Sequence, residues 1–144
     1  MNEISHMDFL ISLLAAMVAG VVIGIERQMK SKNAGLKTNA LVAVGAAIFV
    51  NISYSFIGID NVDNSRIISQ IIVGVGFLGA GVIMKRKEHV SGLATAASIW
   101  CSAGLGCLAA LKMYVELATA TALIVSINLI FGFLNKYIYK KKND

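Results

Sequence analysis

An acidic and a basic residue, Glu26 and Arg27, stand side by side directly after an uncharged stretch that covers residues 9–25. If that stretch is a helix, the carboxylate lies near the helix C-terminus, where the helix dipole disfavours negative charge. Local helix energetics therefore give no reason for an acid at this position, and a partner must come from elsewhere in the chain.

The starts of two later helices, near Thr38 and Thr95, offer such a partner because the first N–H groups of a helix have no intrahelical acceptor. Lys37 adds a positive charge next to the first of them. We predict that Glu26 folds back onto one of these helix starts and, with Arg27, closes a small polar pocket. The alternative is an exposed Glu–Arg pair at the lipid headgroups, which would contribute only about 0–1 kcal/mol.

A second polar group, Asp63, Arg66 and Gln70, has the i, i+3, i+7 spacing that places side chains on one side of a helix. Asp63 would cap the start of that helix, while Arg66 and Gln70 would point along one face toward Gly74. Two interpretations remain open: a polar vestibule that senses or admits a solute, or an N-cap followed by an arginine at the membrane interface.

Neither the histidines nor the cysteines have the spacing of a metal or catalytic site. His6 and His89 have no second ligand at metal spacing, and Cys101 and Cys107 lie six residues apart in one stretch, where a disulfide is geometrically poor. We therefore expect no enzymatic activity, no metal site and no cofactor.

The glycine-rich segment at residues 74–81 contains the letters of a dinucleotide-binding GxGxxG motif. That motif requires a preceding strand and a helix that starts in water, whereas these glycines lie inside a long apolar stretch. We predict that they serve close helix packing, which applies to Gly74, Gly76, Gly79 and Gly81.

The elements that must position these residues follow from the composition. The chain is 57% hydrophobic and 15% charged, with a mean hydropathy of +0.74, so it has too few polar groups to cover a water-exposed surface. Cutting the sequence at its charged residues leaves five uncharged runs, and each is close in length to the roughly 20 residues that a helix needs to cross a bilayer. We predict an all-α integral membrane protein, one transmembrane domain over residues 1–144, with five helices at residues 9–25, 38–59, 67–84, 90–111 and 117–135.

Basic residues predict the orientation of these helices. If the N-terminus is outside and the C-terminus inside, only Arg66 and Lys112 of the 13 basic residues face outward, as the positive-inside rule favours. The basic tail at residues 136–142 would suit nucleic acid in a soluble protein, but directly after a span it is typical of an anchor on anionic lipid. We expect the lipid bilayer as a partner and no nucleic acid.

Small residues recur at four-residue spacing on three of the predicted helices, which allows close helix approach when lipid removes the hydrophobic drive. We predict packing faces here, some of them between two copies of the chain in a homodimer. The residues are Ala16, Gly20 and Gly24; Ala94, Ser98, Ser102, Gly106 and Ala110; and Ala118, Ala122 and Ser126.

The loops also indicate a weak internal repeat. Gly35-Leu36-Lys37-Thr38 and Gly92-Leu93-Ala94-Thr95 each lead into an even-numbered span. The first and second helices would then relate to the third and fourth as a parallel repeat about the membrane normal, with a fifth helix added.

Several segments together resemble the MgtC/SapB family of bacterial inner-membrane proteins. They are Glu26-Arg27-Gln28, residues 34–38, Ser65-Arg66-Ile67, residues 70–81, and residues 92–100, which end in Trp100. The resemblance implies a multi-pass protein of the bacterial inner membrane that is linked to magnesium homeostasis and to envelope stress.

Three positions depart from the family pattern. Asn64-Ser65 replaces a usual proline, Asn39 stands where a histidine is common, and Ala94 replaces a threonine. Longer members continue into a cytoplasmic C-terminal domain, so we expect no regulation of this chain through such a domain.

Two classes of function follow. One is a membrane-embedded regulatory or accessory protein that binds another membrane protein; the other is a transporter or channel for Mg²⁺ or another small ion. A pathway for Mg²⁺ favours carboxylates or exposed carbonyls, yet the strongly polar groups in the middle of the runs are the amides of Asn51, Gln70 and Asn128. The sequence therefore favours the regulatory or accessory role.

Overall fold

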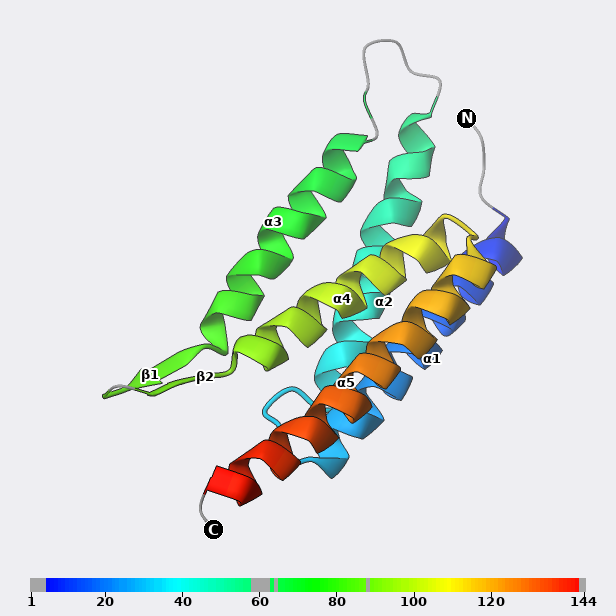
Figure 1. Cartoon of the computed structure of the whole chain (residues 1–144). Coiled ribbons are helices and arrows are strands. Elements are labelled where there is room, and N and C mark those ends of the chain that lie inside the picture. The colour runs from blue at the N-terminus through cyan, green and yellow to red at the C-terminus, as the bar shows by residue number, and fades with distance from the viewer. Residues whose placement is uncertain (1–4, 58–62, 64, 88, 143–144) are drawn as a thin grey trace.

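The computed structural model describes residues 5–57, 63, 65–87 and 89–142 of the chain. Within them the chain forms five α-helices, one short 3₁₀ helix and one two-stranded hairpin (Figure 1). The elements are α1 (His6–Met29), α2 (Leu36–Ser53), η1 (Tyr54–Phe56), α3 (Ser65–Gly81), β1 (Met84–Arg86), β2 (His89–Ser91), α4 (Leu93–Ala110) and α5 (Tyr114–Lys142).

Several helix ends differ from the prediction. Helix α1 continues to Met29, so Glu26 and Arg27 lie inside its last turns, and α5 continues to Lys142. Helix α2 ends at Ser53 and α3 at Gly81, earlier than the uncharged runs. Cutting at charges misplaced these ends because helix termination depends on backbone hydrogen bonding, and long basic side chains are tolerated inside a helix end.

The link between α3 and α4 is a hairpin where we expected a five-residue loop, and its strands include Met84, Val90 and Ser91, which we expected in the third and fourth helices. Strand β1 pairs antiparallel with β2, with Lys85 opposite Val90, and Lys87 in the turn has a positive φ of 52°. Figure 1 shows the hairpin projecting beyond the ends of both helices. Each strand has only three residues, which is too short for an alternation of apolar and polar side chains to identify it in the sequence.

Glycines start both α2 and α4. Gly35 and Gly92 are the N-cap residues, so Thr38 and Thr95 are each the third residue of their helix. Gly92 has a φ of +92°, and a Cβ there would collide with the carbonyl oxygen of Val82. A side chain at this position is therefore excluded twice, by backbone conformation and by space.

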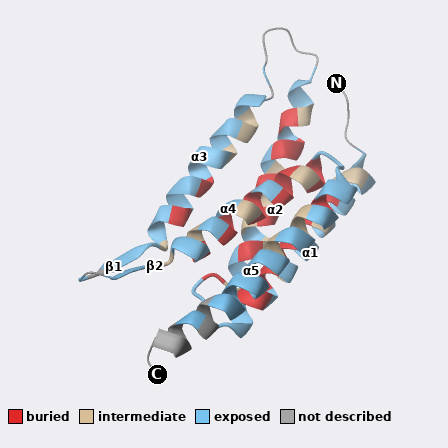
Figure 2. Cartoon of the chain, viewed as in Figure 1, coloured by how far each residue is buried: buried red, intermediate tan, exposed pale blue. Residues whose placement is uncertain are grey.

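The core lies between α1, α2 and α4. Figure 2 shows most of the buried residues on these three helices. Small side chains dominate it, so the helix backbones approach closely, as expected for helices in lipid. The fully buried alanines are Ala16, Ala43, Ala47 and Ala109, and Ile23 is the largest side chain with 0% exposure.

Helices α3 and α5 lie at the periphery. Val75 and Gly79 are the buried residues of α3, and Figure 1 shows α3 leaning away from α2 toward the start of α4. The predicted packing roles of Gly74, Gly76 and Gly81 are wrong within the chain, because a Cβ at each would meet nothing within 4 Å.

The small-residue stripe predicted on α5 also faces away from the core. Ala118, Ala122 and Ser126 are all exposed, while Leu117 is buried. Sequence spacing identifies a narrow face on a helix, but it does not say whether another helix of the same chain covers it.

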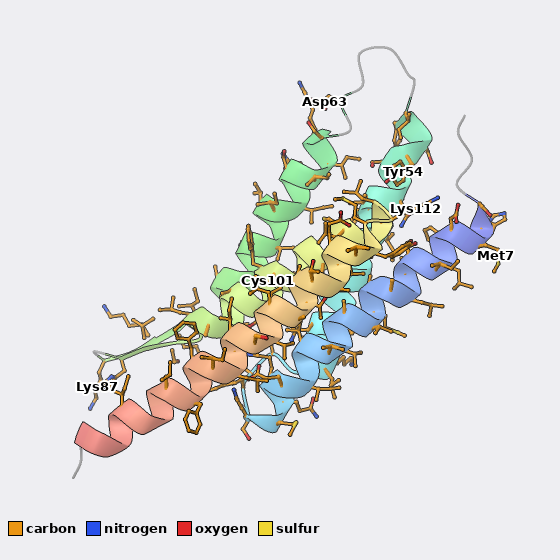
Figure 3. All side chains as sticks on the ribbon, turned by 45° about the vertical axis from the view of Figure 1, so that its right-hand side comes forward. Met7, Tyr54, Asp63, Lys87, Cys101 and Lys112 are labelled. Carbon is orange, nitrogen blue, oxygen red and sulfur yellow. The ribbon has the colours of Figure 1, made fainter. Side chains whose placement is uncertain are left out.

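The described helices that are long and apolar enough to cross a membrane are α1, α2 continued through η1, α4 and α5; α3 is an apolar helix of 17 residues. Their loops gather at two ends. At one end Lys112 bonds Asp8 at 2.7 Å and Tyr54 donates to the carbonyl of Ala110 at 3.3 Å. Figure 3 shows Tyr54 and Lys112 at this end and Lys87 at the other.

Candidate functional site

A charged cluster is buried at the end of the bundle opposite Lys112. Glu26 is 7% exposed and Arg27 4% exposed, although both are charged residues near a helix terminus. They continue the buried stripe of α1 that includes Ala19 and Ile23, because residues three, four and seven apart share a helix face. The inward face of α1 therefore changes from small apolar residues to an ion pair at its end.

Arg27 connects α1 to α4. Its Nη2 donates to Thr95 Oγ1 at 2.7 Å, and this hydrogen bond is buried. The N-cap at Gly92 positions Thr95 in the first turn of α4. The structure thus brings together two of the predicted site residues, one from each half of the predicted repeat.

Glu26 has a different partner from the one expected. Lys30, one turn later on α1, approaches Glu26 Oε1 to 2.6 Å as an ion pair. The start of α2 is instead contacted by Gln28, whose Oε1 accepts from the Leu36 N–H at 3.3 Å. The prediction that Glu26 folds back onto a helix start is therefore wrong, because an i, i+4 lysine lies closer.

Lys30 also reaches across to α5. Its Nζ donates to the main-chain oxygen of Asn128 at 2.8 Å, and a Cβ on Gly132 would lie 2.6 Å from the same nitrogen. Sequence reasoning missed Lys30 as part of this cluster. Its i, i+4 spacing from Glu26 was a usable signal, but nothing in the sequence indicated the contact with α5.

Four buried polar atoms at or beside these residues have no hydrogen-bond partner in the described part of the chain. They are both carboxylate oxygens of Glu26, Arg27 Nε and Asn128 Nδ2. Glu26 Oε1 is nevertheless paired with Lys30 at 2.6 Å, so Oε2 is the carboxylate oxygen without a partner among the described residues. Buried polar groups are nearly always hydrogen-bonded in native proteins, so an unsatisfied group of this kind marks a candidate binding or coupling site.

The charges of this cluster restrict what it can bind. Arg27 and Lys30 contribute two positive charges against the single negative charge of Glu26. An environment with this balance repels a free cation and favours an acidic or neutral polar group.

The remaining predicted residues at this end are divided between core and surface. Asn39 is 0% exposed; its Nδ2 donates to the carbonyls of Ala34 and Gly35, and its Oδ1 accepts from Ser102 Oγ at 2.8 Å. Lys37 and Thr38 are exposed. Asn39 lies on the buried face of α2, so Lys37 and Thr38, which precede it in the sequence, lie on the exposed face.

Two glycines of α1 allow this close contact with α2. A Cβ on Gly20 would lie 2.6 Å from the carbonyl oxygen of Asn39, and one on Gly24 would lie 2.5 Å from the Cα of Leu36. Trp100, by contrast, is 52% exposed on α4 and is not part of the buried cluster around Glu26 and Arg27.

The second predicted group lies at the opposite end. Asp63 Oδ1 accepts from the Ser65 N–H at 2.9 Å and from Ser65 Oγ at 2.6 Å, and these bonds hold the pKa of the Asp63 carboxyl below its usual value. Arg66 and Gln70 share one groove with Gly74, as their spacing predicted. The groove is otherwise apolar, and Gln70 is exposed.

The chain is similar in sequence to curated bacterial proteins. It is 47% identical over 123 residues to Protein MgtC of Salmonella typhimurium strain LT2, which covers 85% of this chain and 52% of that protein. It is also 47% identical over 116 residues to Protein MgtC of Brucella abortus strain 2308, covering 81% of this chain and 48% of that one. The chain therefore spans about half the length of the curated relatives it matches. No solved structure matches the chain.

The profile of the MgtC family matches residues 13–137. This range contains the buried cluster of Glu26, Arg27 and Thr95 as well as the glycine-rich α3. The chain belongs to the MgtC family.

Proposed function

We propose that this chain is a membrane-embedded regulatory or accessory protein, not an enzyme, that is linked to magnesium homeostasis and binds another membrane protein. The link to magnesium limitation and envelope stress comes from the family resemblance. The mode of action is inferred from how the bundle is built.

The observation that carries the proposal is that the α1–α2–α4 core is closed by its own polar groups. Arg27 bonds Thr95, Ser102 bonds Asn39, and Asn51 Nδ2 donates to Ser12 Oγ at 2.9 Å. Each bond joins two helices, so together the three bonds fix how α1, α2 and α4 pack against one another. Such a core suits a rigid scaffold better than a conducting path.

A transporter or channel for Mg²⁺ or another small ion is the second candidate. The feature that favours it is the buried Glu26 carboxylate, whose Oε2 has no partner in the described residues. Against it, no group of three or more His, Cys, Asp or Glu within the described residues has metal-binding geometry. The neighbouring Arg27 and Lys30 also repel cations.

Reconstitution into liposomes separates the two candidates. We expect purified protein to give no saturable Mg²⁺ uptake above protein-free liposomes, while the same chain supports growth in low magnesium of a bacterium that lacks its MgtC-family protein. Saturable flux that disappears on Glu26→Gln would overturn the accessory role.

We expect Glu26→Gln to impair growth in low magnesium by at least about tenfold in plating efficiency at equal protein level, because it leaves Arg27 as a buried cation without an acid beside it. Glu116→Gln is the matched control, since Glu116 is exposed in the first turn of α5. Equal growth of the two variants would contradict a role for the buried cluster.

The chain is further proposed to be a multi-pass protein of the bacterial inner membrane, with its N-terminus outside and its C-terminus inside. The excess of basic residues in the α1–α2 and α3–α4 loops and in the tail supports this orientation. A homodimer is proposed from the exposed small-residue face of α5. Crosslinking in native membranes that returns only monomer over a range of expression levels would exclude the dimer.

A further inference from the structure

We propose that the groove between α2 and α3 binds one membrane phospholipid, with an acyl chain along the groove and the phosphate against Arg66. Three observations support this assignment: the apolar lining, the length of the groove, and the position of its polar groups.

The groove has a volume of about 650 Å³ and apolar walls, apart from Arg66 and Gln70. It exists because α3 leans away from α2 and packs against α4 through Val75 and Gly79. Its walls include Leu41, Gly45 and Phe49 from α2 and Ile67, Gly74 and Leu78 from α3.

The length of the groove matches one leaflet. Its α3 wall runs from Arg66 to Leu78, and twelve residues at 1.5 Å each span about 18 Å. Half of a hydrocarbon core of ~30 Å is ~15 Å. With Arg66 at headgroup level, an acyl chain in the groove would therefore end near the middle of the bilayer.

The groove is open along one side, and its apolar walls on α2 and α3 continue over about 18 Å. A flexible hydrocarbon chain can follow such a groove along its length. A helix of another protein, which would insert a row of side chains, is the competing occupant that the crosslinking experiment below tests.

The polar end of the groove fits a phosphate. Asp63 lies beside Arg66 in sequence, but its Oδ1 is engaged by two hydrogen bonds from Ser65. Within the described residues no side chain forms an ion pair or hydrogen bond with Arg66 or Gln70. A guanidinium binds phosphate oxygens in a bidentate manner, and the Gln70 amide adds a donor one helical turn further into the groove.

Two glycines in the walls provide the test. A Cβ on Gly45 or on Gly74 would meet nothing within 4 Å, and both residues line the groove, so a leucine at either position is expected to extend into it. Gly76 is the matched control, because its Cβ also meets nothing within 4 Å and it is not part of the groove wall.

The experiment is native mass spectrometry of delipidated protein in detergent, titrated with phosphatidylglycerol. We expect the unchanged chain to bind one phospholipid, and Gly45→Leu and Gly74→Leu each to weaken that binding by about tenfold or more. Gly76→Leu should bind like the unchanged chain. Arg66→Gln should weaken the binding of phosphatidylglycerol by about tenfold but leave the binding of uncharged diacylglycerol within twofold.

Proteoliposomes that contain phosphatidylglycerol with a photoactivatable group in mid-chain provide a second measurement. Labelling should fall on peptides of α2 and α3 and should be lost in Gly74→Leu. Equal lipid binding by the Gly74→Leu and Gly76→Leu variants, both monodisperse on size exclusion, would overturn the proposal. Labelling of another helix, or a crosslink from position 74 to a second copy or another protein in place of lipid, would overturn it as well.

Discussion

Replacing Arg27 with methionine is expected to lower the free energy of unfolding by about 3–5 kcal/mol. Arg27 is 4% exposed, donates a 2.7 Å hydrogen bond to Thr95 and lies beside the buried carboxylate of Glu26. Methionine preserves much of the side-chain volume but removes the charge, so Thr95 loses its donor and Glu26 keeps only Lys30 nearby. Unfolding in detergent can be followed by the fluorescence of Trp100, the one tryptophan in the sequence.

Thr95→Val measures the other side of this contact. It removes the acceptor at nearly constant shape and should cost about 1.5–3 kcal/mol, the range for hydrogen bonds to charged groups. The double variant should cost less than the sum of the two single ones, because both remove the same bond. Lys37→Met, an exposed basic residue of α2, should stay within about 0.5 kcal/mol. An Arg27→Met variant as stable as Lys37→Met would contradict the structural role of the contact.

Gly106→Ala in α4 is the second substitution with a large expected effect. A Cβ at Gly106 would collide with the carbonyl oxygen of Ala43 and lie 2.9 Å from its carbonyl carbon. These atoms belong to the backbone of α2, which does not move without separating two core helices. We expect the free energy of unfolding to fall by about 1–3 kcal/mol or more, because the packing of α2 against α4 is weakened.

Gly104→Ala is the matched control on the same helix, two residues away. A Cβ there meets nothing within 4 Å and the position is exposed. Alanine is the better helix former, so this variant should gain about 0.5–1 kcal/mol. The same chemical change is thus expected to have opposite signs at the two positions. A shared sign, measured by thermal unfolding in the same detergent, would show that the α2–α4 contact does not depend on Gly106.

The helical elements were predictable because lipid imposes a local rule. A run of about 20 apolar residues must satisfy its own backbone hydrogen bonds, so it forms a helix whatever its neighbours do. Each of the five apolar runs contains an α-helix, although α3 is only 17 residues long and the fourth run begins in strand β2. The hairpin at β1 and β2 was not predictable, since three-residue strands leave no clear periodicity.

The glycines show how far sequence spacing can be interpreted. Gly20, Gly24 and Gly106 lie against the backbone of a neighbouring helix, whereas Gly74, Gly76 and Gly81 have open space. All six were predicted as packing residues, the first three from small-residue stripes at four-residue spacing and the last three from the glycine-rich segment at residues 74–81. The difference comes from the crossing of the helices: α1, α2 and α4 pack face to face, while α3 diverges from α2.

The sequence by itself determined which apolar runs contain helices, because helix formation in an apolar run depends on local composition and on the backbone hydrogen bonds within the run. Only the tertiary structure decided which groups the polar side chains at the helix ends bond to. Arg27 bonds Thr95, 68 residues away, and Lys30 bonds the backbone of Asn128, 98 residues away, while Thr38 at the equivalent place in α2 is exposed. Such choices depend on where helices cross and how each is rotated, and those quantities are set by the packing of the whole bundle rather than by any one segment.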